Sequence, residues 1–125
     1  MSMEIRNPYA MTINMRTTNP IAAGKHLGFF RNRYERGIKR RYKSYLFIPI
    51  LENKPHLHYH LITSRPTEYK HTEYIDIIKD ALSKTKQLQS DYNIVKPAYH
   101  IEGWADYITK FKYIDDEVDL INLKR

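Results

Sequence analysis

The stretch from Lys54 to Ile62, KPHLHYHLI, constrains the fold of this chain more than any other, because a histidine occupies every second position within it. A β-strand sends successive side chains to opposite faces of its sheet, so His56, His58 and His60 would line one face. Imidazole is the commonest protein ligand of divalent metal ions, and ring nitrogens about 6–7 Å apart along a strand can converge on one ion. The pattern therefore predicts a metal-binding strand; the alternative is a polar strand face whose histidines meet only water.

The length of 125 residues predicts a single domain over residues 1–125 with its own core. The chain has no cysteine, which excludes a disulfide framework, a thiolate zinc site and a cysteine nucleophile. No stretch approaches the roughly 20 apolar residues of a membrane span, and the N-terminus lacks the apolar core of a signal peptide. We therefore expect a soluble, cytoplasmic protein without a membrane partner.

The formal net charge is +7, from 21 basic and 14 acidic residues, and the basic excess is concentrated between residues 25 and 43. A basic half on a small domain indicates a polyanionic partner, usually nucleic acid. A basic protein whose charge serves solubility alone is the alternative. The candidate nucleic-acid contacts are Arg31, Arg33, Arg36, Lys39, Arg40, Arg41 and Lys43.

Apolar periodicity and turn residues divide the rest of the chain into strands and helices. Glu52 to Pro55 reads as a tight connection, so the strand before it and the histidine strand, which ends near Thr63, should form a hairpin. A further arm, acidic at its start, follows from about residue 113 to 125. The other expected elements are strands over 9–17, 42–51 and 92–101 and helices over 22–36, 67–89 and 102–111. Thr18-Asn19-Pro20 is expected to break the first strand, and Gly37 lies near the end of the first helix.

This order, βαββαβ followed by a C-terminal helix, is that of the split βαβ, ferredoxin-like fold. Such a fold is α+β, with a four-stranded antiparallel sheet and helices on one of its faces. Its third strand is central in the sheet, and here the third strand carries the histidines. We therefore expect the histidines on a rigid central strand.

A second constellation lies on the expected C-terminal helix, where Tyr107 and Lys110 are three residues apart and share one helix face. A phenol is a poor nucleophile at neutral pH, because its pKa lies near 10. It becomes useful when a metal polarises the electrophile and a nearby cation supports the anion. Tyrosine, lysine and metal together are suited to attack on a phosphodiester. The alternative is a surface lysine beside a half-buried tyrosine.

Taken together, the histidine strand and Tyr107-Ile108-Thr109-Lys110 resemble the second and third motifs of the HUH endonucleases. The resemblance is to the small single-tyrosine initiators (Rep proteins) of rolling-circle replication in viruses, phages and plasmids. The segment from Ala10 to Asn14 resembles the first motif more loosely. With the element order, the resemblance covers most of residues 9–112.

The resemblance implies a metal-dependent endonuclease that nicks and rejoins single-stranded DNA at an origin, which can be a hairpin, in the cytoplasm of a host cell. Two histidines would hold Mg²⁺ or Mn²⁺. Tyr107 would attack the scissile phosphate, leaving a 5′-phosphotyrosyl enzyme and a free 3′-hydroxyl, and Lys110 would assist. The chain carries no Walker-type GxxxxGK segment, so another protein would supply the helicase. A homodimer would let two tyrosines alternate between cleavage and joining.

The motif uses two histidines and this chain offers three, of which His58 and His60 form the favoured pair because Leu61 and Ile62 follow them. His56 remains an alternative ligand, or a third one. The family often adds an acidic ligand; Glu52 is nearest, but we expect it in the turn. His100 and Glu102 are weaker candidates.

Two other functions stay open. One is a single-strand transposase of the same superfamily, which shares the fold and the histidine motif. The other is a non-catalytic domain that binds single-stranded DNA or RNA, since ferredoxin-like sheets with exposed aromatic residues do this.

Overall fold

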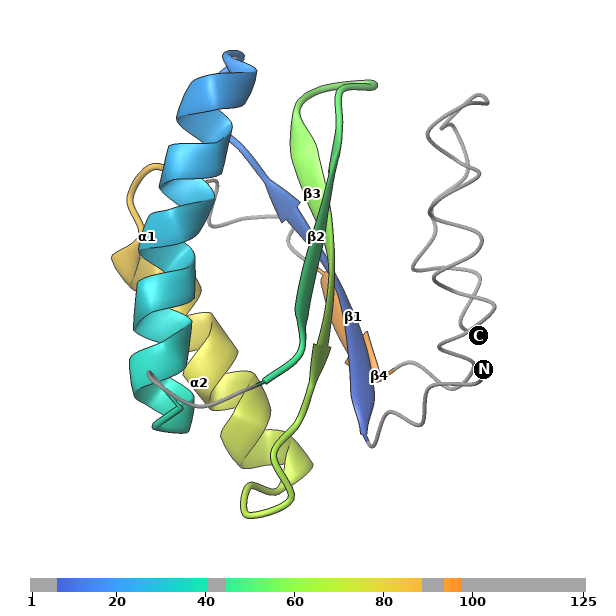
Figure 1. Cartoon of the computed structure of the whole chain (residues 1–125), viewed down its shortest axis with the longest axis vertical. Coiled ribbons are helices and arrows are strands. Elements are labelled where there is room, and N and C mark those ends of the chain that lie inside the picture. The colour runs from blue at the N-terminus through green and yellow to red at the C-terminus, as the bar shows by residue number, and fades with distance from the viewer. Residues whose placement is uncertain (1–6, 41–44, 89–93, 98–125) are drawn as a thin grey trace.

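The computed structural model describes residues 7–40, 45–88 and 94–97 (Figure 1). The expected C-terminal helix and acidic arm lie outside these residues, as do Arg41, Lys43, His100, Glu102, Tyr107 and Lys110. The elements are β1 (Pro8–Asn14), α1 (Pro20–Ile38), β2 (Phe47–Glu52), β3 (His58–Ser64), α2 (His71–Lys84) and β4 (Ile94–Pro97).

The histidine strand, β3, lies between two antiparallel neighbours. It pairs with β2 on one side and with β1 on the other. The registers place His60 opposite Ile50 of β2 and opposite Thr12 of β1. The short segment β4 runs antiparallel along the other edge of β1. The predicted α+β class, the antiparallel sheet and the interior position of the histidine strand are confirmed.

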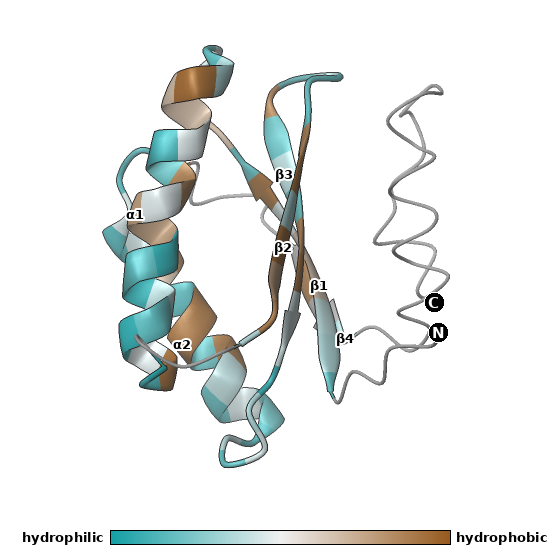
Figure 2. Cartoon of the chain, viewed as in Figure 1, coloured by the Kyte–Doolittle hydropathy of each residue, from teal (hydrophilic) through white to brown (hydrophobic). Residues whose placement is uncertain are grey.

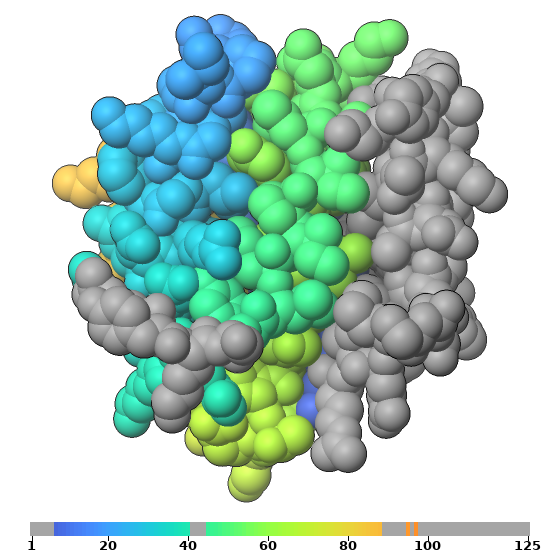
Figure 3. All heavy atoms as spheres, viewed as in Figure 1, coloured from blue at the N-terminus to red at the C-terminus, as the bar shows by residue number. Residues whose placement is uncertain are grey.

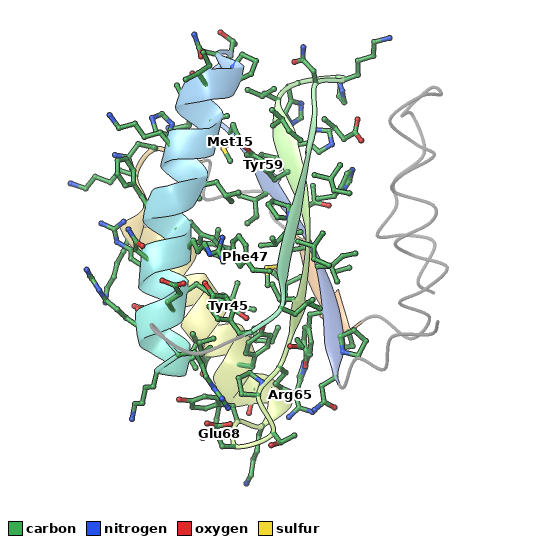
Figure 4. The ribbon with its side chains drawn as sticks, viewed as in Figure 1. Met15, Tyr45, Phe47, Tyr59, Arg65 and Glu68 are labelled. Carbon is green, nitrogen blue, oxygen red and sulfur yellow. The ribbon has the colours of Figure 1, made fainter. Side chains whose placement is uncertain are left out.

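Both helices cover the same face of the sheet (Figure 1). The core between the layers contains Tyr59 and Leu61 of β3 together with Leu27 and Phe30 of α1. In Figure 4 the labelled side chains of Met15, Tyr59 and Phe47 lie between α1 and the strands. Because side chains alternate along a strand, His58, His60 and Ile62 lie on the opposite face, away from the helices.

α1 begins at Pro20, two residues before the expected start at Ala22. Asn19 is its N-cap, since the Asn19 side chain accepts hydrogen bonds from the backbone N–H groups of Ile21 and Ala22. Proline is favoured in the first helical turn, where its missing N–H costs nothing. The Asn-Pro pair therefore starts the helix, although it was expected to end the preceding strand and form a break.

The close packing of α1 on α2 requires a glycine. A Cβ atom on Gly37 would lie 2.5 Å from the Cγ2 of Ile77, which is closer than real Cβ contacts. Two residues later, Lys39 takes a left-handed backbone conformation with φ 59° and ends the helix. The expected end of the helix near Gly37 is thus confirmed, and the glycine is explained by packing.

α2 spans His71–Lys84 and is shorter than the expected 67–89. Residues 66–69 form a turn instead, closed by a hydrogen bond from the Tyr69 N–H to the Pro66 carbonyl oxygen. At the other end, the Thr85 hydroxyl donates to the carbonyl oxygen of Ala81. Within the described ranges, neither helix is long and apolar enough to cross a membrane.

Candidate metal centre on the central strand

His58 and His60 form a close pair on the sheet face away from the helices. Their side chains are buried, with only 6% and 4% of each residue exposed. The two Nε2 atoms lie 3.3 Å apart, and the ring planes are nearly perpendicular at 86°. Strand alternation explains why both rings share a face, since Tyr59 between them points into the helix-covered core.

The tautomer of His58 follows from its hydrogen bond. Its Nδ1 lies 2.8 Å from the backbone carbonyl oxygen of His56, and a carbonyl can only accept. Nδ1 therefore carries the proton, and the lone pair of the neutral ring is on Nε2. Metal-ligating histidines commonly have this arrangement, in which the second ring nitrogen donates to a backbone carbonyl.

His60 is also neutral at physiological pH. Burial of the ring, and then the proximity of His58, lowers its pKa from 6.5 to about 3. Its Nδ1 lies 3.5 Å from the Thr12 hydroxyl oxygen on β1. Neutral imidazole is the form that binds metal ions, so His60 presents a nitrogen ligand without a prior loss of a proton.

The separation of the two Nε2 atoms fits adjacent ligands of one ion. Two ligand atoms about 2.1 Å from an ion, at roughly 90–110° to each other, lie about 3.0–3.4 Å apart. The observed 3.3 Å is within this range. Among the described residues, however, no group of three or more histidine, cysteine or acidic side chains is arranged to hold an ion. The pair is therefore a partial ligand set.

The expectation that all three histidines share one strand is wrong for His56. β3 begins at His58, and His56 lies in the connection before it with its side chain exposed. Its Nε2 donates to the side-chain oxygen Oδ1 of Asn14 at 2.8 Å. Its ring centroid lies 5.8 Å from that of His58, so His56 is close to the pair but directs this nitrogen to Asn14.

Glu52 was expected in the turn, and this expectation is also wrong. Glu52 is the last residue of β2 and is directly paired with His58 across the ladder. It is buried, with 8% of the residue exposed. Residues directly opposite in an antiparallel pair project from the same face of the sheet, so the Glu52 carboxylate belongs to the same surface as the histidines.

Two polar residues of β1 that were not singled out as site residues complete this surface. Asn14 pairs with His58, and Thr12 pairs with His60. These four polar side chains therefore form two neighbouring cross-strand pairs on one face of the sheet. The signal is present in the sequence, because Thr12 and Asn14 alternate with the apolar Met11 and Ile13. Only the register of β1 against β3 identifies their partners.

The candidate nucleic-acid contacts lie apart from the histidines. Arg31, Arg33, Arg36, Lys39 and Arg40 are all on or just after α1, which packs against the other face of the sheet. Three of them, Arg31, Arg33 and Arg40, make side-chain contacts within the protein, and Arg33 donates to the carbonyl oxygen of Phe29 at 3.4 Å. The Arg31 guanidinium lies 4.6 Å from the ring centroid of Phe47, and Arg40 forms an ion pair with Glu68 at 2.7 Å. The structure therefore does not bring the basic helix and the histidine pair together.

Comparison of this chain with models of protein families, with curated proteins and with solved structures finds no match. Function is therefore argued from the site.

Proposed function

We propose that this protein is a metal-dependent endonuclease and strand-joining enzyme of the HUH type, acting on single-stranded DNA through Tyr107. The observation that carries the proposal is the pair of buried histidines on the interior strand, with Nε2 atoms 3.3 Å apart. Two imidazole nitrogens held at this separation on one rigid strand suit coordination of a single divalent ion.

The fold proposed for this enzyme is the ferredoxin-like one, with β4 as its fourth strand. The support is the pairing of β4 with β1, which gives the strand order β2-β3-β1-β4. In this order each helix connects two strands that are parallel to each other, as in a split βαβ unit. The remaining support is the element order β1, α1, β2, β3, α2, β4 along the chain.

The position of Pro97 supports a role for Tyr107 at the histidines. Pro97, the last residue of β4, is in register with Tyr9 of β1, whereas Thr12, three residues further along β1, pairs with His60. The distance along the sheet between these rows is about 10 Å. Ten residues, from 98 to 107, follow Pro97 up to Tyr107 and reach up to about 33 Å when extended. Tyr107 is therefore within reach of the histidine pair.

In the proposed reaction the Tyr107 phenol oxygen attacks the scissile phosphorus. The phenol gives up its proton as a bond forms between its oxygen and phosphorus. The phosphorus–O3′ bond breaks, and the departing 3′-oxygen takes up a proton, so the step is balanced. The products are a 5′-phosphotyrosine and a strand with a free 3′-hydroxyl. Attack by a 3′-hydroxyl on the phosphotyrosine reverses the step and rejoins the strand. Lys110 supports the negative charge during both steps.

His58 and His60 would hold Mg²⁺ or Mn²⁺, which supplies Lewis acidity that polarises the phosphate. Glu52 is the favoured third ligand, because it is directly opposite His58 and projects from the same face. Its side chain would have to turn toward the pair, since the three groups do not converge in the present arrangement. A carboxylate oxygen would add the hard ligand that both ions prefer. His56 is less suited, since its Nε2 already donates to Asn14.

The test is a denaturing gel with labelled single-stranded oligonucleotides of varied sequence, in Mn²⁺ or in EDTA. The wild-type protein should give a denaturation-resistant protein–DNA band in Mn²⁺ and none in EDTA. The variants Tyr107→Phe and His60→Gln should abolish the band. Tyr113→Phe and His26→Gln are the matched controls, and both should retain it.

A band that persists in Tyr107→Phe would show that another tyrosine is the nucleophile. If no substrate gives a band, while the wild-type protein shifts single-stranded DNA equally well in EDTA and in Mn²⁺, the protein is a binding module and the proposed reaction is wrong.

A further inference from the structure

The outer surface of α1 carries a stripe of positive charge that lies directly opposite its buried side. The buried residues of α1 are Ala23, Leu27, Phe30, Tyr34 and Ile38. At about 100° per residue, Lys25 and Arg36 fall within roughly 20° of each other on the side away from these residues. Lys39 follows directly after the last residue of the helix. All three are exposed. We refer to Lys25, Arg36 and Lys39 as the α1 stripe.

Within the described part of the chain, the charges of the α1 stripe are not neutralised by ion pairs. Among the described residues, no ion pair involves a member of the stripe. The acid on this helix, Glu35, is turned to the side, where it accepts a hydrogen bond from the Tyr45 hydroxyl and lies 3.7 Å from Arg31. Figure 2 shows that the C-terminal half of α1 is predominantly hydrophilic on its outer side.

We propose that the α1 stripe is a binding site for the phosphate backbone of double-stranded DNA, separate from the histidine site. The first argument is charge complementarity, since lysine and arginine aligned on one rigid element form the electrostatic footprint of nucleic-acid binding. The three charges span about 21 Å along the helix, at 1.5 Å per residue. Duplex DNA presents phosphates at fixed positions over such a length, so a rigid row of cations can meet several of them at once.

A duplex fits this surface better than a single strand, because single-strand sites combine charge with open aromatic faces on which bases stack. None of the three stripe residues is aromatic. Phe29, a partly exposed ring between Lys25 and Arg36 on this side, stacks on His26 with ring centroids 6.1 Å apart. The nearest large rings at the β2 side of α1, Tyr45 and Phe47, are covered by the Arg31 guanidinium, which lies 5.4 Å and 4.6 Å from their centroids. Figure 3 shows α1 and β2 side by side on this surface.

The position of the stripe makes it a second site. α1 packs on the Tyr59 face of the sheet, whereas His58 and His60 project from the other face. A strand held at the histidines therefore does not run along α1. DNA contacted at both places would have to present a duplex to one face of the protein and a single strand to the other.

The test measures binding of a labelled blunt duplex by fluorescence anisotropy, in EDTA and at several salt concentrations. The variant neutralises the stripe with Lys25→Gln, Arg36→Gln and Lys39→Asn, the last chosen because asparagine tolerates the left-handed conformation of residue 39. Loss of three phosphate contacts should reduce the slope of log K against log salt by about 2.7 and weaken binding at least about tenfold at 0.1 M salt.

The control variant removes three exposed charges from α2 and the residues after it: Lys79→Gln, Lys84→Gln and Lys86→Gln. It has the same net charge as the stripe variant and should bind the duplex nearly as well as the wild type. A second variant, Lys25→Arg with Arg36→Lys, keeps the charge and should bind normally. Circular dichroism before and after heating checks that each variant is folded.

Equal losses in the stripe and control variants would mean that net charge alone governs binding, and would overturn the proposal. Affinity for a single strand that equals the affinity for the duplex, and falls equally in the stripe variant, would also overturn it. The assay requires neither metal nor cleavage, so failure of the nicking reaction leaves the result interpretable. A functional nickase with no stripe effect would reject this site alone.

Discussion

The ring of His58 is fixed by the backbone of His56, whose carbonyl oxygen lies 2.8 Å from the His58 Nδ1. The His56 ring is fixed in turn by Asn14 of β1, through a hydrogen bond of 2.8 Å from Nε2 to Oδ1. Since His56 lies in the connection before β3, this second bond ties the connection to the end of β1. The orientation of one ring of the candidate metal pair thus depends on a residue of a neighbouring strand.

We predict that Asn14→Ala weakens Mn²⁺ binding about tenfold, at the lower end of the effect usual for partners of metal ligands. The physical reason is that the His56 backbone is no longer held where its carbonyl orients His58. Titration of the metal-free protein with Mn²⁺, followed by electron paramagnetic resonance or calorimetry, measures this without DNA. Asn32→Ala, at an exposed position on α1, is the control and should bind as the wild type does.

The double variant distinguishes positioning from ligation. If Asn14 acts through His56, then His56→Ala should cost about as much as Asn14→Ala, and the two together should cost little more, because both remove the same tether. A much larger loss in His56→Ala than in Asn14→Ala would instead identify His56 as a ligand.

We predict that His60 makes the metal-free protein less stable in acid. Its pKa is 6.5 when unfolded and about 3 in the folded protein, so between these values the unfolded state binds the extra proton. Stability is therefore highest above pH 6.5 and declines as the pH falls, with a slope of up to about 1.4 kcal/mol per pH unit. Urea unfolding at pH 7.5, 5.5 and 4.5 tests this. In His60→Gln the loss between pH 7.5 and 4.5 should be markedly smaller; an identical loss would contradict the assignment.

The alternation of apolar and polar residues correctly predicted a strand with His58 and His60 on one face, because alternation is a local pattern. The element order predicted the interior position of this strand, which the pairing with β1 and β2 confirms. Segment ends were less predictable. Asn19-Pro20 was interpreted as a break, although the same two residues can cap and start a helix, and local sequence does not decide between these uses. Likewise, alternation suggested a strand from His56, yet the ladder with β1 and β2 begins at His58.

The composition of the site depends on strand register, which local patterns do not reveal. Glu52 ends β2 and His58 begins β3, six residues later. The two residues pair directly because the connection between the strands is longer than a two-residue turn. Asn14 and Thr12 are distant in sequence, so their place beside the histidines required the β1–β3 register. The basic residues of α1 were predictable as a group, but local patterns do not reveal that they lie on the face of the sheet opposite the histidines.

The close helix contact at Gly37 leads to a stability prediction. In Gly37→Ala the new methyl group would meet the Cγ2 of Ile77, an atom on a stiff β-branched side chain. We expect a net loss of about 1–2 kcal/mol, because the cost of overpacking exceeds the gain in helix propensity. Gly28→Ala is the matched control, since its new methyl group would meet no atom within 4 Å.

Thermal or urea unfolding should show that Gly28→Ala leaves stability unchanged or raises it by up to about 1 kcal/mol. The double variant Gly37→Ala/Ile77→Ala also truncates the opposing side chain. Its loss of folding stability should be smaller than the sum of the losses in the two single variants. Equal stabilisation by Gly37→Ala and Gly28→Ala would mean that the helices adjust their separation freely.

The last prediction concerns a buried chain of hydroxyl groups that joins both helices to the sheet. The Tyr74 hydroxyl of α2 lies 2.5 Å from that of Tyr34 on α1 and 2.7 Å from the Thr63 hydroxyl on β3. Burial raises the pKa of Tyr34 to about 12, so its hydroxyl stays protonated through the usual pH range.

Tyr74→Phe leaves the other two hydroxyls buried without their common partner, which should cost about 1–3 kcal/mol of folding stability. Tyr34→Phe keeps the pair of Tyr74 and Thr63 and should cost less. Tyr69→Phe, whose side chain is only partly buried, is the control for the loss of a phenol oxygen. If urea unfolding finds Tyr74→Phe no more destabilised than Tyr69→Phe, the three hydroxyls do not act as a connected unit, and shape alone holds the two helices on the sheet.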